Sequence, residues 1–172
     1  MLTEPKFRTA QIECFKDQGF VIFPKAFDVA EAKTIQDWTV ELTEAPEEPG
    51  RHWVYHETSL VKKDLSLINR IENMTPFHEG FRRLADSLLL SVGQLFGEEA
   101  VLFKDKINFK MPGGDGFKAH QDSQAGWENY ASYFISVMVS IDPATQQNGC
   151  LQLARRPEKE LAGREWEPLT EA

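Results

Sequence analysis

The sequence predicts an α+β domain with a mainly antiparallel sheet or barrel, because helical patterns come first and strand patterns follow them. Before Val101, apolar residues recur at the three- and four-residue spacing of amphipathic helices. From Val101 the apolar period is two, the spacing of strands with one buried face. A length of 172 residues suits one domain with a real core, so we expect residues 1–172 to form a single domain.

Composition and charge are those of an ordinary globular protein, with 41% hydrophobic and 27% charged residues. The formal net charge of -8 argues against binding to nucleic acid or to a membrane surface, since both require a positive surface. No apolar run approaches the roughly 20 residues that span a bilayer, and the N-terminus lacks the apolar region of a signal peptide. We therefore expect a cytoplasmic protein in which Cys14 and Cys150 are reduced thiols.

Three segments carry helix signals. Thr9 is placed to cap a short helix that Gly19 ends, and Asp28 with Glu31 forms the capping box of a second helix. Pro76 opens the third and clearest helix. Each helix has an apolar stripe expected in the core: Ile12 and Phe15; Ala32, Ile35 and Leu42; and Phe77, Phe81, Leu84, Leu88, Val92 and Leu95.

Strand signals are found in four segments. Residues 20–27 read as a strand that Pro24 confines to an edge or an end, and residues 52–57 read as extended. Residues 101–111 and 132–142 alternate with period two, and Asn148-Gly149 is a hairpin turn signal. In residues 101–111 the apolar side chains lie opposite a polar set: Lys104, Lys106, Asn108 and Lys110. This polar set fits a solvated face, and it equally fits a cation that points into a barrel and pairs with a carboxylate ligand.

The chemistry of the chain centres on His120-Gln121-Asp122. Residues two apart on an extended backbone point to the same side, so His120 and Asp122 can share one metal ion. A second histidine from a distant strand would complete the two-His, one-carboxylate set that leaves three positions open on ferrous iron. Three glycines precede the motif, in MPGGDGFKA, and allow the backbone to approach a site closely. The same residues also fit a surface loop in which Asp122 accepts a backbone N–H.

The remaining motifs favour structural interpretations. Gly113-Gly114-Asp115-Gly116 lacks the Gly-Lys-Ser/Thr of a phosphate-binding loop. His52 and His56 lie in an extended segment, which does not favour chelation of one ion, and His78 is expected to be exposed in the first turn of the third helix.

The order of these elements resembles the phytanoyl-CoA dioxygenase family of iron(II)- and 2-oxoglutarate-dependent oxygenases. The stretches that carry the resemblance are FKDQGFVIFPKAF, KINFKMPGGDGFKAHQD and NGCLQLA, and the likeness runs from about residue 9 to residue 154. It implies a double-stranded β-helix (a cupin-like jelly roll) with flanking N-terminal helices.

The resemblance also implies roles for individual residues. His120 and Asp122 correspond to the first two iron ligands, and Gln121 to a residue that approaches 2-oxoglutarate in some members. A lysine or Asn108 on the preceding strand would help hold this cosubstrate, which makes Lys106, Asn108 and Lys110 cofactor-binding candidates, and Trp127 would line the substrate cavity.

The implied reaction is hydroxylation of a small molecule by dioxygen, with decarboxylation of 2-oxoglutarate to succinate. The family's distal histidine and its 2-oxoglutarate-binding arginine have no counterpart in this sequence, and Arg155-Arg156-Pro157 stands where a small residue and a histidine are common. We therefore expect a partial barrel that lacks its last strands.

Two alternatives to a self-sufficient oxygenase remain open. One is a catalytically inactive jelly-roll relative that acts as a binding or scaffold protein. The other is a barrel that a partner chain completes by strand addition. Exposed strand edges also favour self-association into a homo-oligomer.

Overall fold

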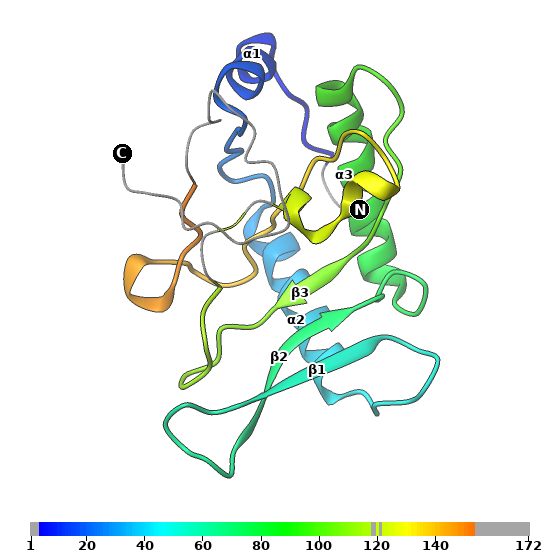
Figure 1. Ribbon diagram of the computed structural model, residues 1–172. Coiled ribbons are helices and arrows are strands. Elements are labelled where there is room, and N and C mark those ends of the chain that lie inside the picture. Colours follow the sequence, from blue (N-terminus) through cyan, green and yellow to red (C-terminus); the bar gives the residue numbers. More distant parts are fainter. Residues whose placement is uncertain (1–3, 118–119, 121, 154–172) are drawn as a thin grey trace.

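The computed structural model describes residues 4–117, 120 and 122–153. The elements follow one another in the order predicted for an α+β domain, helices first, with a sheet that is antiparallel throughout (Figure 1). Their bounds are α1 (Thr9–Gln18), α2 (Val29–Glu44), β1 (Trp53–Thr58), β2 (Ser66–Glu72), α3 (Glu79–Phe96), β3 (Lys106–Asn108) and the single-turn 3-10 helices η1 (Asp122–Ala125), η2 (Trp127–Asn129) and η3 (Gln146–Asn148).

The three strands lie in the order β1-β2-β3, and one face of this sheet forms the core. Val54, Ile71 and Ile107 are paired across the three strands, so their side chains share this face. Ile71 is completely buried. α2 and α3 pack on the same face, and in Figure 1 α2 passes behind the sheet. The buried cluster consists of Ile35, Leu42, Ile71, Met74, Phe81, Leu84 and Ile107.

Helix termini follow the local sequence closely. The Asp28 carboxylate accepts the Glu31 N–H at 2.8 Å, and the Glu31 side chain accepts the Asp28 N–H at 2.8 Å, which confirms the predicted capping box. Gly19 ends α1 at φ 82°, as predicted, whereas the N-cap of α1 is Arg8 instead of Thr9.

The prediction that His78 is exposed was wrong. His78 is the N-cap of α3, and its Nδ1 accepts the Phe81 N–H at 3.2 Å. The imidazole ring lies beside the Trp38 and Phe81 rings, and its Nε2 is 3.1 Å from a Glu41 oxygen. Only 14% of the His78 side chain is therefore exposed, because its capping position turns the ring towards α2.

The strand predictions were correct in part. β1 (Trp53–Thr58) matches the extended segment predicted at residues 52–57 to within one residue. Residues 20–27 form no strand, because Pro24 has no N–H to donate and Lys25 has φ 56°. β2 was not predicted. Within residues 101–111 only β3 is formed, and residues 132–142 form no ladder with any described strand. Alternation makes a strand only where a partner supplies hydrogen bonds, so the predicted double-stranded β-helix is not formed by the described residues.

Two further observations concern the remaining sequence predictions. Cys14 and Cys150 are both free thiols. Within the part of the chain that the structure describes, no helix is both long and apolar enough to cross a bilayer.

Candidate metal and cosubstrate site

The glycine loop that leads to His120 is fixed against the hairpin between β1 and β2. The Gly113 carbonyl accepts the Leu60 N–H at 2.7 Å and the Ser59 hydroxyl at 3.3 Å. Gly113 has φ 87°, and a Cβ atom there would lie 2.7 Å from both Ser59 Oγ and Val61 Cγ2. The close approach that the glycines allow is therefore made to the hairpin, which anchors the loop.

The next part of the loop contacts a carboxylate on β1. Glu57 accepts the Asp115 N–H at 3.2 Å through Oε2. Its other oxygen, Oε1, occupies the space that a Cβ atom on Gly114 would need. Glycine at position 114 is thus what lets the loop reach Glu57, and this contact sets the path of the chain towards the predicted ligands.

His120 and Asp122 lie together at the start of η1. His120 Nε2 is 3.6 Å from Asp122 Oδ1, and the two side chains are 29% and 37% exposed. The second carboxylate oxygen, Oδ2, accepts a hydrogen bond from the Ser136 hydroxyl. Ser136 belongs to residues 132–142, the segment in which the sequence alternates with period two. Gln121, the predicted cosubstrate residue between the two, lies outside the described residues.

The donor atoms of this pair fit a ferrous ion. Imidazole nitrogen and carboxylate oxygen atoms lie about 2.1 Å from a bound transition metal, so atoms 3.6 Å apart can share one ion. Among the residues that the structure describes, no group of three His, Cys, Asp or Glu side chains could hold a metal. His120 and Asp122 are thus a pair of side chains that could share one metal ion.

The other histidines lie elsewhere. His56 Nε2 is 2.7 Å from a Glu47 oxygen on the outside of β1, and His78 caps α3. His52 is buried, with 4% exposure, and its ring nitrogens have no hydrogen-bond partner among the described residues.

Trp127, the predicted substrate residue, comes shortly after His120 and Asp122 in the sequence and is held in a cluster of aromatic rings. Its ring centroid lies 5.5 Å from that of Phe103 and 5.3 Å from that of Phe134. The Lys104 ammonium lies 6.0 Å from the Trp127 ring centre. The full aromatic cluster is Phe103, Trp127, Tyr130 and Phe134.

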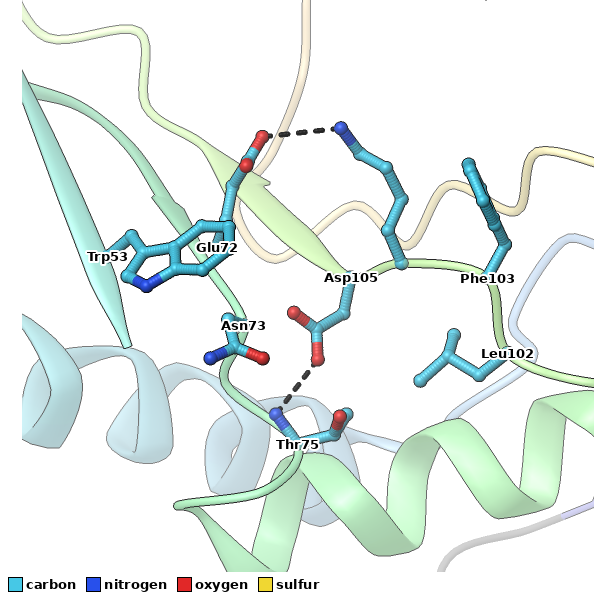
Figure 2. A pocket seen from close by; sticks show the side chains of 8 residues that line it. Trp53, Glu72, Asn73, Thr75, Leu102, Phe103 and Asp105 are labelled. Carbon is cyan, nitrogen blue, oxygen red and sulfur yellow. Dashed lines mark hydrogen bonds and ion pairs between the residues drawn. The ribbon is translucent and has the colours of Figure 1, made fainter. Parts of the chain in front are cut away.

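A cavity of about 300 Å³ adjoins this cluster at the end of the sheet (Figure 2). Phe103 and Lys104 line it and also contact Trp127, so Trp127 supports the cavity wall without forming part of it. The Asp105 carboxylate accepts the N–H groups of Met74 and Thr75 at 2.9 and 2.8 Å. The lining residues are Trp53, Glu72, Asn73, Thr75, Leu102, Phe103, Lys104 and Asp105.

The predicted cosubstrate residues divide into two groups. Lys106 and Asn108 are exposed on the sheet face opposite buried Ile107, as the alternation predicted. Lys110 instead donates a hydrogen bond to the Gly149 carbonyl, at the turn after η3. Register pairs Lys106 with Glu72 and Asn108 with Arg70. We call this side of the sheet the polar sheet face; its residues are Trp53, Tyr55, Arg70, Glu72, Lys106 and Asn108.

Sequence reasoning missed Arg70 and Glu72 because it did not predict β2. Glu72 is largely buried, and one of its oxygens lies 3.1 Å from Arg70 Nε and 3.4 Å from Lys104 Nζ. The signal was present in the sequence: charged Arg70 and Glu72 flank apolar Ile71, which is the alternation of a half-buried strand.

Comparison with known proteins identifies the family of the chain. The family model for phytanoyl-CoA dioxygenase (PhyH) matches residues 15–160. The chain is 42% identical over 150 residues to 2-aminoethylphosphonate dioxygenase of uncultured bacterium HF130_AEPn_1. The aligned region covers 86% of the chain and 57% of that protein. It is 32% identical over 146 residues to methylphosphonate hydroxylase of Gimesia maris, covering 83% of the chain and 54% of that protein.

A third relative is dioxygenase lolE1 of Epichloe uncinata, to which the chain is 31% identical over 162 residues. The aligned region covers 91% of the chain and 61% of that protein. The chain thus spans little more than half the length of these curated relatives. No solved structure is significantly similar to it. The family match and the relatives together show that the chain belongs to the phytanoyl-CoA dioxygenase (PhyH) family.

Proposed function

We propose that this chain is part of an iron(II)- and 2-oxoglutarate-dependent dioxygenase that hydroxylates a small molecule. The observation that carries the proposal is the His120–Asp122 pair, 3.6 Å apart within the family-matched segment. In this proposal residues 1–172 belong to one oxygenase domain, and β1 to β3 are one part of a double-stranded β-helix.

Iron held by His120 and Asp122 would supply the coordination sites for 2-oxoglutarate and dioxygen. The reaction converts a substrate C–H bond, dioxygen and 2-oxoglutarate into C–OH, succinate and carbon dioxide. The protein's own task is to hold ligands in place and to bind the two organic molecules. Ser136 contributes by binding Asp122 Oδ2, which leaves Oδ1 on the side of His120.

The cosubstrate candidates keep their roles as proposals. Lys106 and Asn108 share the polar sheet face with Arg70, where a carboxylate could be held. Lys110 would have to release the Gly149 carbonyl to act in this way, and Gln121 is proposed only from its place between the ligands. Trp127 is proposed to shape the substrate cavity through its contact with Phe103.

The substrate class that we propose is small organophosphonates. Two relatives are named for phosphonate compounds. The cavity beside the aromatic cluster is lined by the cation Lys104, and Arg70 lies 3.1 Å from its lining residue Glu72. A phosphonate group is a compact anion that such cations recognise.

The test is succinate formation by the full-length protein with ferrous iron, 2-oxoglutarate and either 2-aminoethylphosphonate or methylphosphonate. We expect turnover in the wild type and a loss of at least about 100-fold in Asp122→Ala, because a first ligand is removed. The matched control is Asp86→Ala, an exposed carboxylate on α3. Full activity in Asp122→Ala would contradict the ligand assignment. A wild type that binds these compounds without forming succinate would instead support an inactive binding relative.

A further inference from the structure

The polar sheet face carries an arginine, Arg70, whose terminal N–H groups have no hydrogen-bond partner among the residues that the structure describes. Two rows cross the three strands on this face, Tyr55–Arg70–Asn108 and Trp53–Glu72–Lys106. Side chains paired in this way lie on one side of a sheet, opposite the core row of Val54, Ile71 and Ile107. In Figure 1 no α-helix crosses this side of the sheet.

Arg70 is fixed in position by two neighbours. Its guanidinium carbon lies 4.5 Å from the centre of the Tyr55 ring, which is a cation–π contact. Arg70 Nε lies 3.1 Å from a Glu72 oxygen, but this approach does not have hydrogen-bond geometry, and Nε is buried without a hydrogen-bond partner among the described residues. The guanidinium is thus held by stacking and charge. The Arg70 side chain is 30% exposed, and its terminal N–H groups, which have no hydrogen-bond partner among the described residues, remain available to a ligand.

The charges around Arg70 are unbalanced. Glu72 is shared between Arg70 and Lys104, and Lys106 lies beside Glu72 in the next strand. The other carboxylate of the cavity, Asp105, is bonded to the backbone N–H groups of Met74 and Thr75. The cations of this region therefore exceed the carboxylates, although the whole chain has a formal net charge of -8.

We infer that Arg70, stacked on Tyr55, is the centre of an oxyanion-binding subsite on the polar sheet face. A planar guanidinium binds carboxylate and phosphonate groups through two parallel hydrogen bonds, a geometry that lysine does not provide. The two sources of such a group are the distal carboxylate of 2-oxoglutarate and the phosphonate of the substrate. This choice of ligands rests on the proposed function, whereas the arrangement of Arg70 does not.

The experiment measures binding of each anion to the full-length protein without iron, in the presence of a chelator. Ligand-observed NMR is suited to weak binding: ³¹P shifts for methylphosphonate and saturation transfer for 2-oxoglutarate. We expect Arg70→Gln to weaken binding of one of the two anions by about tenfold or more, because a charge-assisted, two-pronged contact is lost. The matched control is Arg83→Gln, an exposed arginine on α3 that pairs with Glu79 and should bind both anions as the wild type does.

The two anions distinguish the source of the ligand. Weaker 2-oxoglutarate binding with unchanged methylphosphonate binding assigns the subsite to the cosubstrate, and the converse assigns it to the substrate. Equal affinity of Arg70→Gln and wild type for both anions, or no binding of either anion to the wild type, would overturn the inference.

The thermal melting curve of Arg70→Gln shows whether this variant is folded. If it is not, two more conservative variants replace it in the binding experiment. Arg70→Lys retains the charge but loses the planar fork, and Tyr55→Leu removes the stacking surface. We expect both to weaken the same anion by a smaller factor, and unchanged binding in both would contradict the inference. Failure of the wild type to form succinate, with anion binding still dependent on Arg70, would refute the proposed function and leave the subsite intact.

Discussion

Residues 4–117 and residues 120–153 differ in how they are held in place. The buried apolar cluster of the described structure lies between Ile35 and Ile107, where α2, α3 and the sheet share one core. The second region contains the predicted iron ligands and is joined to the first by individual side-chain contacts. Gln36 donates a hydrogen bond to the Ile141 carbonyl, and Lys110 donates one to the Gly149 carbonyl. The Phe96 ring contacts the Tyr133 ring edge to face. The core therefore determines stability, and single polar contacts determine the geometry of the site.

The largest expected effect is on the core. Ile71→Ala leaves a cavity at the centre of the sheet face that α2 and α3 cover, and it should lower the free energy of unfolding by about 2–5 kcal/mol. Chemical denaturation followed by tryptophan fluorescence measures this loss. The control Ile22→Ala, at a residue 67% exposed, should change stability by less than about 0.5 kcal/mol. Similar losses in both variants would show that the core lies elsewhere.

The next prediction breaks the contact that fixes the glycine loop within the first region, just before His120. Gly114→Ala places a methyl group on Glu57 Oε1, so the loop must move, at an expected cost of about 1–3 kcal/mol in the free energy of unfolding. Since this loop leads to His120, metal affinity should fall as well. The control Gly116→Ala meets no atom within 4 Å and should leave both properties unchanged. Glu57→Ala removes the bond to the Asp115 N–H and should lower metal affinity as well; unchanged affinity in Glu57→Ala would show that the Glu57 contact does not position the loop.

A third prediction separates site geometry from stability. Ser136→Ala removes the hydroxyl that binds Asp122 Oδ2, and loss of such a supporting hydrogen bond lowers metal affinity by about 10–100-fold. Because Ser136 is exposed, the free energy of unfolding should change by less than about 0.5 kcal/mol. Titration with Fe²⁺ under anaerobic conditions measures the affinity, with Ser140→Ala as the control. Equal metal affinity in Ser136→Ala and wild type would exclude the positioning role.

The sequence predicted the ends of helices better than it predicted the strands. Helices satisfy their own hydrogen bonds, so local signals sufficed: the Asp28–Glu31 capping box and the C-terminal Gly19 were both predicted. Strands require partners, so residues 132–142 alternate without forming a ladder, and β2 was missed between two correctly predicted elements.

In the candidate site, the sequence predicted a pair of neighbouring residues but not the contacts between distant residues. The sequence predicted that His120 and Asp122 lie together because of their spacing on an extended backbone. The two side chains do lie 3.6 Å apart, although Asp122 begins the 3-10 helix η1. The stacking of Arg70 on Tyr55 and the hydrogen bond from Ser136 to Asp122 depend on strand register and on contacts between distant residues. No local pattern specifies such contacts.

The smallest expected effect compares the two lysines that were predicted to hold the cosubstrate. Lys106 lies on the polar sheet face beside Glu72, whereas the Lys110 ammonium is bonded to the Gly149 carbonyl. Lys106→Ala should therefore raise the KM for 2-oxoglutarate about threefold with kcat unchanged, as expected when an exposed charge worth roughly 0.5–1 kcal/mol is lost from binding. Lys110→Ala should leave this KM unchanged. Steady-state succinate formation by the full-length protein measures both constants, and a larger rise in KM for Lys110→Ala would assign the cosubstrate contact to Lys110, with release of the Gly149 carbonyl on binding.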